Sequence, residues 1–213
     1  LLFHDLKYYL DHEKAPIAGF TPDCKYPVVY AERGRAVIKV KADLDHLITF
    51  MNKYILNTQN KGERLGIDYK NDEFGQLEIR NYHLTKEDFS FSISYPAGIT
   101  LEEILDQLNR IEGYEYEVVS HFKPVYFDKK APMVEIMKET YEYVTGNDGT
   151  PVTTTGGTYA KMMPHIVPFG PSFPGQKGIG HNPNEWMTRE DLITNAKIYA
   201  LTLYQLSRKE TEL

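Results

Sequence analysis

The sequence has 213 residues, of which 41% are hydrophobic and 25% are charged, a size that suits one ordinary domain or two small ones. This composition is typical of a globular protein with a buried core and excludes a disordered chain. The net charge is −6, the opposite of the basic excess found in nucleic-acid binding proteins, so we expect no nucleic-acid partner. No run approaches the roughly 18 apolar residues that a membrane span needs, so we expect no membrane partner.

The cysteine content indicates the compartment. The chain has one cysteine, Cys24, so it cannot form an intramolecular disulfide, and it fits the reducing cytoplasm. Residues 1–5 contain no initiating methionine, and the opening of the chain shows no secretory leader pattern. We therefore expect a cytoplasmic protein, and we expect this sequence to be part of a longer chain.

The first elements are a short helix and a strand. Apolar residues at helical spacing predict a helix within 1–13, which Pro16 and Gly19 close. A loop at 19–23 follows, and then a strand over 28–30 that ends near Gly34.

The middle of the chain has a pattern of its own, with strands predicted at 35–40, 76–80, 89–95 and 115–121 and a loop at 57–75. One helix is predicted over 44–55 with Asp43 as its N-cap, and a second follows a capping box at Thr100 and Glu103 and ends at Gly113. The order βαββαβ predicts a ferredoxin-like unit. In the strand at 89–95, large apolar residues alternate with three serines, which predicts one face toward a core and one toward water.

The last third predicts two helices around a loop-rich tract. One helix begins at Pro132 and ends at Gly146, and the final helix follows Thr188 as N-cap. Between them we expect loops, with a short strand at Ile166-Val167. The spacing in the final helix predicts a buried face made of Leu192, Ile193, Ala196, Tyr199, Ala200, Leu203 and Leu206. The fold class is therefore α/β, with 35–123 inserted between 1–34 and 124–213.

Glycine-dense loops in compact proteins are more often functional than idle, and two such segments hold residues able to bind a metal ion. His181 lies in a loop that Pro183 keeps out of a helix, and imidazole is the commonest metal ligand. Asp23 offers a carboxylate, a second common ligand. The spacing alone favours simpler interpretations, a surface-loop histidine and a turn-forming aspartate.

A third loop, residues 153–158, could hold a small anion. Its Gly156-Gly157 pair leaves backbone N–H groups unobstructed, and its threonines add hydroxyl donors. A flexible connector is the alternative. The sequence contains none of the standard motifs of a phosphate loop, a hydrolase serine elbow or a zincin helix. We interpret Cys24 as a small packing residue rather than a nucleophile.

Four segments together resemble the bacterial PepV-type dipeptidases of the M20 metallopeptidase family, in both their order and their internal spacing. The resemblance covers most of the chain and is strongest over 150–206. The segments are Gly19-Phe20-Thr21-Pro22-Asp23, Thr155-Gly156-Gly157-Thr158-Tyr159-Ala160, Phe169-Gly170-Pro171-Ser172-Phe173-Pro174-Gly175 and His181-Asn182-Pro183-Asn184-Glu185.

The resemblance implies that Asp23 and His181 each bind one ion of a two-metal site, with zinc or manganese as the metal, and meet in one pocket. Gly157 and Thr158 would receive the C-terminal carboxylate of a dipeptide substrate. The segments 1–34 and 124–213 would be portions of a zinc-peptidase-like catalytic domain, and 35–123 its lid. In such enzymes the two ions activate a water for attack on the peptide carbonyl, with a glutamate as general base.

Several family features have no counterpart in this sequence. The family's first His-x-Asp, its bridging aspartate and its glutamate pair, including the general base, precede the position of Asp23 and are not found in 1–22. A lid segment with a histidine is missing near Val40, and Ser94 stands where the family has an arginine that pairs with the substrate carboxylate. We therefore expect an incomplete, inactive dipeptidase chain. The alternatives are a non-catalytic homologue that binds peptides or partners, and a module that forms a homodimer through an edge strand of the lid.

Overall fold

The computed structural model describes residues 3–176, 180 and 182–208, and it shows a mixed α/β fold, as predicted. The chain divides into two compact units. The discontinuous unit comprises Leu1–Ala31 and Tyr126–Leu213, and the inserted unit comprises Glu32–Val125. In the part of the chain that the structure describes, no helix combines the length and the apolar character needed to cross a membrane.

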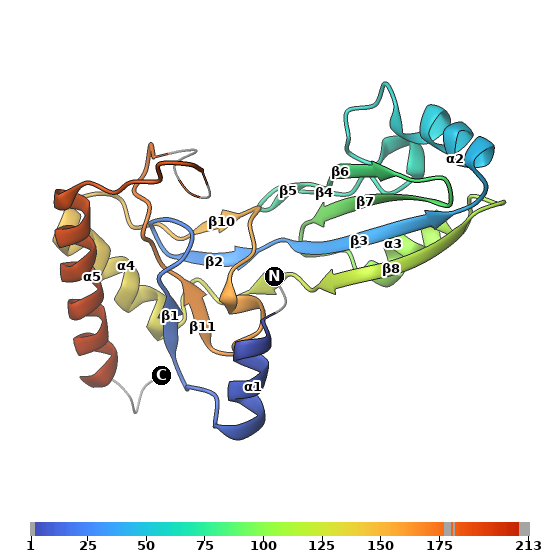
Figure 1. The fold of residues 1–213 in the computed structure, drawn as a ribbon. Coiled ribbons are helices and arrows are strands. Elements are labelled where there is room, and N and C mark those ends of the chain that lie inside the picture. Colours follow the sequence, from blue (N-terminus) through green and yellow to red (C-terminus); the bar gives the residue numbers. More distant parts are fainter. Residues whose placement is uncertain (1–2, 177–179, 181, 209–213) are drawn as a thin grey trace. The chain divides into compact units, whose positions relative to one another are not determined.

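The inserted unit is built on a four-stranded antiparallel sheet in the order β6-β7-β3-β8 (Figure 1). Its elements follow the predicted order βαββαβ, and this strand order is the ferredoxin-like one. The segment at 57–75, predicted as a loop, also contains a 3-10 turn and a two-stranded hairpin. The elements are β3 Gly34–Lys41, α2 Leu44–Phe50 with a π-helical turn at Met51–Ile55, η2 Glu63–Leu65, β4 Lys70–Asn71, β5 Gly75–Gln76, β6 Glu78–Leu84, β7 Asp88–Tyr95, α3 Leu101–Leu108 and β8 Glu115–Phe122.

Both helices of this unit begin at the predicted caps. The Asp43 carboxylate accepts a hydrogen bond from the backbone N of His46 at 3.0 Å. The Thr100 hydroxyl accepts from the backbone N of Glu103 at 3.2 Å, and the Glu103 carboxylate accepts from the backbone N of Thr100 at 2.8 Å. These bonds satisfy first-turn N–H groups that a helix leaves unpaired.

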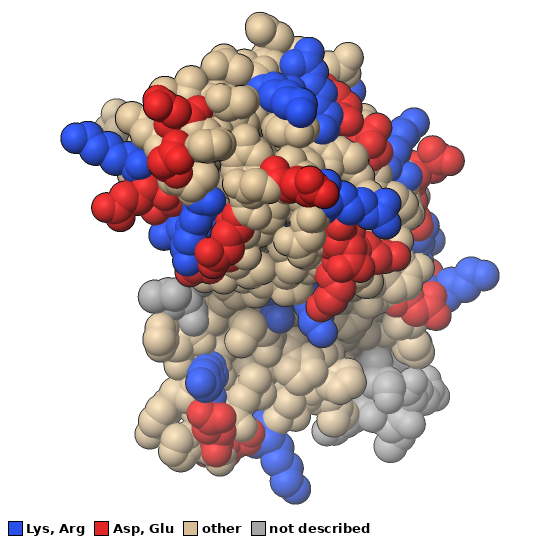
Figure 2. All heavy atoms as spheres, turned by 90° about the vertical axis from the view of Figure 1, so that its right-hand side faces the viewer, with Lys and Arg blue, Asp and Glu red and all other residues tan. Residues whose placement is uncertain are grey.

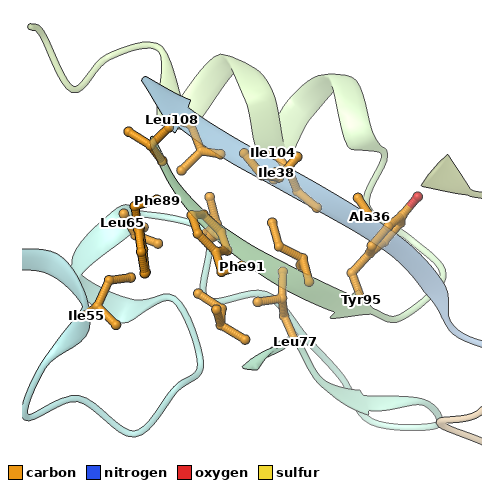
Figure 3. Packing of buried hydrophobic residues seen from close by; sticks show 14 of the residues in the cluster. Ala36, Ile38, Ile55, Leu65, Leu77, Phe89, Phe91, Tyr95, Ile104 and Leu108 are labelled. Atoms are coloured by element: carbon orange, nitrogen blue, oxygen red, sulfur yellow. The ribbon is translucent and has the colours of Figure 1, made fainter. Parts of the chain in front are cut away.

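The core of the inserted unit lies between one face of the sheet and its helices (Figure 3). Ile38 of β3 and Phe89 and Phe91 of β7 are fully buried there, together with Ile104 and Leu108 of α3. The strand residues alternate in sequence as predicted, because successive side chains of a strand point to opposite faces. The period-two pattern at 89–95 thus identified the core face correctly.

The opposite face of β7 is less exposed than the sequence predicts. Ser92 and Ser94 are only 5% and 6% exposed, so the serine face is not open to water at these two positions. β7 is a central strand, and Arg80 of β6 and Val37 of β3 stand opposite Ser92 in the register. Short serine side chains between longer ones are covered by their neighbours, a cross-strand effect that the alternation pattern does not contain.

Charged side chains of both signs are interspersed on the face shown in Figure 2. On the sheet of the inserted unit, the Lys41 ammonium lies 2.7 Å from Glu117 and 3.6 Å from Glu115, and the Lys39 ammonium lies 3.4 Å from Asp88. Hydrogen bonding to Glu117 raises the pKa of Lys41 above its usual value. Exposed pairs of this kind contribute little to stability.

A buried tyrosine makes the stability of the inserted unit fall with rising pH in the alkaline range. The Tyr95 hydroxyl lies 2.5 Å from Nε2 of His121, and burial raises the pKa of Tyr95 to about 12. An unfolded tyrosine ionises near pH 10, so the stability that Tyr95 contributes is complete below pH 10 and is lost as the pH rises toward 12. We expect the free energy of unfolding to fall between pH 10 and 12 and Tyr95→Phe to flatten that fall.

Chemical denaturation at a series of alkaline pH values measures this slope. Tyr143→Phe is the matched control, since its ring is 83% exposed and its removal should leave the slope unchanged. An equal slope in wild type and Tyr95→Phe would contradict the prediction.

The discontinuous unit contains a parallel pair of strands, β1 and β11, and a three-stranded sheet in the order β10-β2-β9. The predicted helix stops and starts are confirmed at Gly146, which has φ 70°, and at Thr188, whose hydroxyl accepts from the backbone N of Asp191 at 3.0 Å. The elements are α1 His4–His12, β1 Gly19–Thr21, β2 Val29–Glu32, β9 Val125–Tyr126, α4 Pro132–Thr145, β10 Val152–Thr154, η3 Tyr159–Lys161, β11 Ile166–Pro168 and α5 Arg189–Arg208.

The core of this unit packs aromatic side chains between the loops and the two long helices, α4 and α5, which lie next to each other (Figure 1). The Tyr26 ring stacks on Tyr141 of α4 with centroids 5.0 Å apart, and it meets Phe169 edge-on at 5.0 Å. All three rings are buried. The residues just beyond β1 and β11 are therefore anchored in the core.

The predicted buried face of α5 is wrong for most of its members. Leu192, Ile193 and Leu203 are 61%, 45% and 57% exposed, and Ala196 and Ala200 are also exposed. The face that packs into the unit carries instead Asn195, Ile198, Thr202 and Leu206. Apolar residues lie on both the packed and the outer side of the helix, and two of the four buried residues, Asn195 and Thr202, are polar, so the spacing of apolar residues cannot tell which side packs.

Candidate functional site

Asp23 lies in the loop that follows β1. Its backbone N–H donates to the carbonyl of Thr21 at 2.8 Å, while its side chain is exposed. Within the described ranges no hydrogen bond to the Asp23 carboxylate is found, so its local backbone contact leaves the carboxylate oxygens available. This is the exposure that a ligand for a hard cation needs.

The loop of Asp23 lies at the carboxyl ends of two parallel strands. β1 and β11 pair in parallel, with Thr21 opposite Pro168, so both strands end at the same edge of the sheet. Beyond that edge, the Gly170 backbone N donates to the Lys25 carbonyl at 3.1 Å and the Tyr26 backbone N donates to the Ser172 carbonyl at 2.8 Å. In open α/β sheets, ligands bind outside the carboxyl ends of the strands.

The loop at 153–158, which carries the Gly156-Gly157 pair, contacts the loop that follows β1. The Cys24 thiol donates to the hydroxyl of Thr154 at 3.4 Å, and that hydroxyl also accepts from the backbone N of Gly156 at 3.2 Å. The backbone N of Phe169 donates directly to the Thr21 carbonyl at 3.0 Å, so the segments 19–23 and 169–175 are in contact, and the flanking residues Cys24 and Thr154 join the segment 155–160 to them. Cys24 contributes to this junction through its thiol.

Gly157 and Thr158 differ in what they offer a ligand. Thr158 is 3% exposed, and its hydroxyl accepts from the backbone N of Ala160 at 3.2 Å, which caps η3. Gly157 is exposed, and a Cβ built there would lie 2.7 Å from Cε of Lys161. A lysine stem therefore runs along Gly157. The sequence analysis did not identify Lys161, although a capped turn starting at Thr158 returns the chain to Gly157 at this spacing.

A polar residue of α5 holds two of these loops in place. Oδ1 of Asn195 accepts from the Tyr26 hydroxyl at 2.6 Å, and its Nδ2 donates to the Pro171 carbonyl at 3.2 Å. Burial raises the pKa of Tyr26 above the usual tyrosine value, so this hydroxyl stays protonated as a donor. Asn195 is 3% exposed. It was not identified from the sequence, where a polar residue in an amphipathic helix carries no mark of burial.

The second predicted metal ligand, His181, lies outside the described residues, so its meeting with Asp23 stays a prediction. Over residues 3–176, 180 and 182–208, no group of three or more His, Cys, Asp and Glu side chains is placed to hold a metal ion. The described residues therefore supply one available carboxylate at this loop and do not by themselves fit a bound metal.

The sequence profile of the peptidase family M20/M25/M40 matches residues 13–205. The chain belongs to this family. The resemblance found in the sequence is thereby confirmed at the level of the M20 family.

The chain is similar to a Staphylococcus aureus (strain USA300) protein named "Putative dipeptidase", with 28% identity over 198 residues, which cover 86% of this chain and 42% of that protein. A protein of the same name from Staphylococcus saprophyticus is 26% identical over 183 residues, which cover 82% of this chain and 39% of that protein. The chain thus spans less than half the length of these curated M20 relatives.

Solved structures of M20 peptidases share the fold. A tripeptidase from Staphylococcus aureus superposes with a TM-score of 0.63 at 14% identity, covering 92% of this chain and 58% of that one. Human carnosine dipeptidase 1 gives 0.58 at 11% identity, with 92% and 58% covered. An M20 family metallo-carboxypeptidase from Sulfolobus solfataricus gives 0.59 at 12% identity, with 93% and 65% covered.

On the inserted unit, the position that departs from the family pattern has a cation beside it. Ser94 of β7 stands opposite Arg35 of β3 on one side and Glu78 of β6 on the other. The Arg35 side chain is exposed and has no ion pair among the residues that the structure describes, whereas Glu78 pairs with Arg33 at 3.3 Å and with Arg80 at 3.0 Å. Residues opposite each other in a sheet share a face, so the Arg35 guanidinium lies next to Ser94.

Proposed function

We propose that this chain is part of a cytoplasmic metal-dependent dipeptidase that hydrolyses the peptide bond of a dipeptide. Membership of the M20 family and the names of the staphylococcal relatives support this proposal. Two divalent ions, zinc or manganese, would supply an activated water when bound. Asp23 and His181 would each be a ligand of one ion, and the general-base glutamate is not among the residues of this chain.

One observation carries the proposal beyond family membership: the exposed Asp23 carboxylate stands at the carboxyl edge of β1 and β11, where the glycine-pair loop also arrives. Gly157 and Thr158 would receive the substrate carboxylate through backbone N–H groups, because the Thr158 hydroxyl already caps η3. Lys161, whose stem passes Gly157, would add a positive charge that favours an anion there.

The inserted unit would act as the lid of this enzyme. Ser94 cannot pair with a carboxylate as an arginine does, and Arg35 offers a guanidinium one strand away. The second candidate is a non-catalytic homologue that binds peptides or partners, or pairs through a lid edge strand. Failure of both Ser94 and Arg35 to bind a substrate carboxylate would favour this candidate.

We expect the 213-residue chain alone to show no turnover of dipeptides in the presence of zinc or manganese. One available carboxylate and one histidine do not make a two-metal site, since affinity depends on the number and geometry of the ligands. Amine release from a panel of dipeptides measures turnover, and equilibrium dialysis measures bound zinc. Turnover by this chain would contradict the incomplete site.

The complete coding sequence separates the two candidates. In that protein, Asp23→Ala should abolish hydrolysis and weaken the binding of one of the two ions. Asp11→Ala is the matched control, because Asp11 is an exposed residue of α1. A complete protein that binds dipeptides but binds no metal and hydrolyses no dipeptide would contradict the peptidase proposal and favour the binding protein.

A further inference from the structure

We propose that the outer face of α5 is an interface through which two copies of this chain pair as antiparallel helices. This face, called the α5 stripe below, is apolar and exposed, with Leu192, Ile193, Leu203 and Tyr204 at 61%, 45%, 57% and 55% exposure. The proposal does not depend on the proposed dipeptidase activity. The α5 stripe consists of Leu192, Ile193, Ala196, Ala200, Leu203 and Tyr204.

The α5 stripe is continuous along the helix. At 3.6 residues per turn, its six side chains fall within an arc of roughly 120°, and from 192 to 204 they extend for about 18 Å along the helix. The opposite side of α5 is the one that packs into the discontinuous unit, through Asn195, Ile198, Thr202 and Leu206. Contiguous exposed apolar patches mark interaction sites.

The order of residues in the α5 stripe fits a second copy. About a centre at position 198, Leu192 is matched by Tyr204, Ile193 by Leu203 and Ala196 by Ala200. A two-fold interface requires the same surface on both partners, so that each residue faces its counterpart across the axis. Two small alanines near the centre and four large side chains toward the ends suit two antiparallel helices in close contact, because the interaxial distance depends on the side chains at the crossing.

The charges at the two ends of the helix are complementary in the same arrangement. Glu190 and Arg208 are separated by 18 positions, which is five turns, so they lie on the same flank of α5. Antiparallel pairing about position 198 brings Glu190 level with position 206 of the other copy, two residues from Arg208, which lies on the same flank, so the two opposite charges lie near each other. Parallel pairing would bring Glu190 next to Glu190. Neither side chain has an ion pair within the described part of the chain, and Arg208 donates to the Tyr204 hydroxyl at 3.4 Å.

The oligomeric state of the 213-residue chain tests the interface. We expect sedimentation equilibrium to show a reversible dimer, and Ile193→Glu to weaken the dimer at least tenfold while circular dichroism shows an unchanged helix content. Ile17→Glu is the matched control, because Ile17 is 59% exposed in the same unit but outside α5. A wild-type chain that stays monomeric at high concentration, or a dimer that tolerates Ile193→Glu, overturns the proposal.

A charge exchange tests the antiparallel geometry. Glu190→Arg and Arg208→Glu, each made alone, should weaken the dimer roughly tenfold by placing like charges side by side in two symmetric positions. The double variant should recover most of the lost affinity. Dimerisation that fails to recover in the double variant, while both single variants weaken it, overturns the antiparallel arrangement.

Discussion

Gly34→Ala is expected to destabilise the inserted unit by roughly 3 kcal/mol, the upper part of the range for overpacking a core. Gly34 stands opposite Tyr95 in the β3 and β7 register, on the core face of the sheet. A Cβ at Gly34 would lie 2.7 Å from both Cε atoms of the Tyr95 ring. The ring cannot move away easily, because Tyr95 is 1% exposed and its hydroxyl is held at His121.

Urea unfolding followed by circular dichroism measures this loss. Gly19→Ala is the matched control, since Gly19 is also a strand glycine but the nearest atom to its added Cβ is 3.7 Å away. Gly34→Ala combined with Tyr95→Leu should cost less than the sum of the two single changes, because the smaller side chain makes room. Equal stabilities of Gly34→Ala and Gly19→Ala would show that the close approach of Gly34 and Tyr95 is not a constraint.

The fold could be predicted where local chemistry decides it. Asp43, Thr100 and Thr188 mark helix starts because their side chains satisfy N–H groups that no other residue nearby can reach. The alternation at 89–95 identified the core face of β7, because a one-residue slip would bury the wrong side chains. These features depend on residues at most a few positions apart.

The misjudged features depend on long-range contacts. Ser92 stands between Val37 of β3, which is distant in sequence, and β6, whose Asn81 donates to the Ser92 hydroxyl at 3.3 Å. The packed side of α5 is chosen by the rest of the discontinuous unit. Leu192 and Leu203 satisfy the helical pattern as well as Ile198 does, and nothing in the spacing ranks the two sides.

The candidate site divides in the same way. Asp23 and Gly157 were identified because they belong to short segments with a family pattern, whereas Asn195 acts through tertiary contacts. Asn195 is 24 positions from Pro171 and 169 from Tyr26. A buried amide that joins two loops is visible only when both loops are placed. The residues that hold the loops of the candidate site in place are therefore the ones that the sequence predicts least well.

Asn195→Leu is expected to destabilise the discontinuous unit by about 2–4 kcal/mol and to loosen the loops beside Asp23. Leucine has the same branching and the same number of side-chain heavy atoms, and it removes both hydrogen bonds. The Tyr26 hydroxyl and the Pro171 carbonyl would then be left without these partners, and each unsatisfied buried group costs about 1–3 kcal/mol.

Thermal and urea denaturation measure the stability, and hydrogen exchange of the Tyr26 and Gly170 amides, which donate the bonds between the loops, measures the loosening. Tyr26→Phe with Asn195→Leu should be more stable than Asn195→Leu alone, because removing both partners leaves no unpaired hydroxyl on Tyr26. Lys197→Ala serves as the control on an exposed position of the same helix. If Asn195→Leu matches that control in both stability and exchange, Asn195 does not hold the two loops together, and the Asp23 loop must be anchored by the aromatic packing of Tyr26 instead.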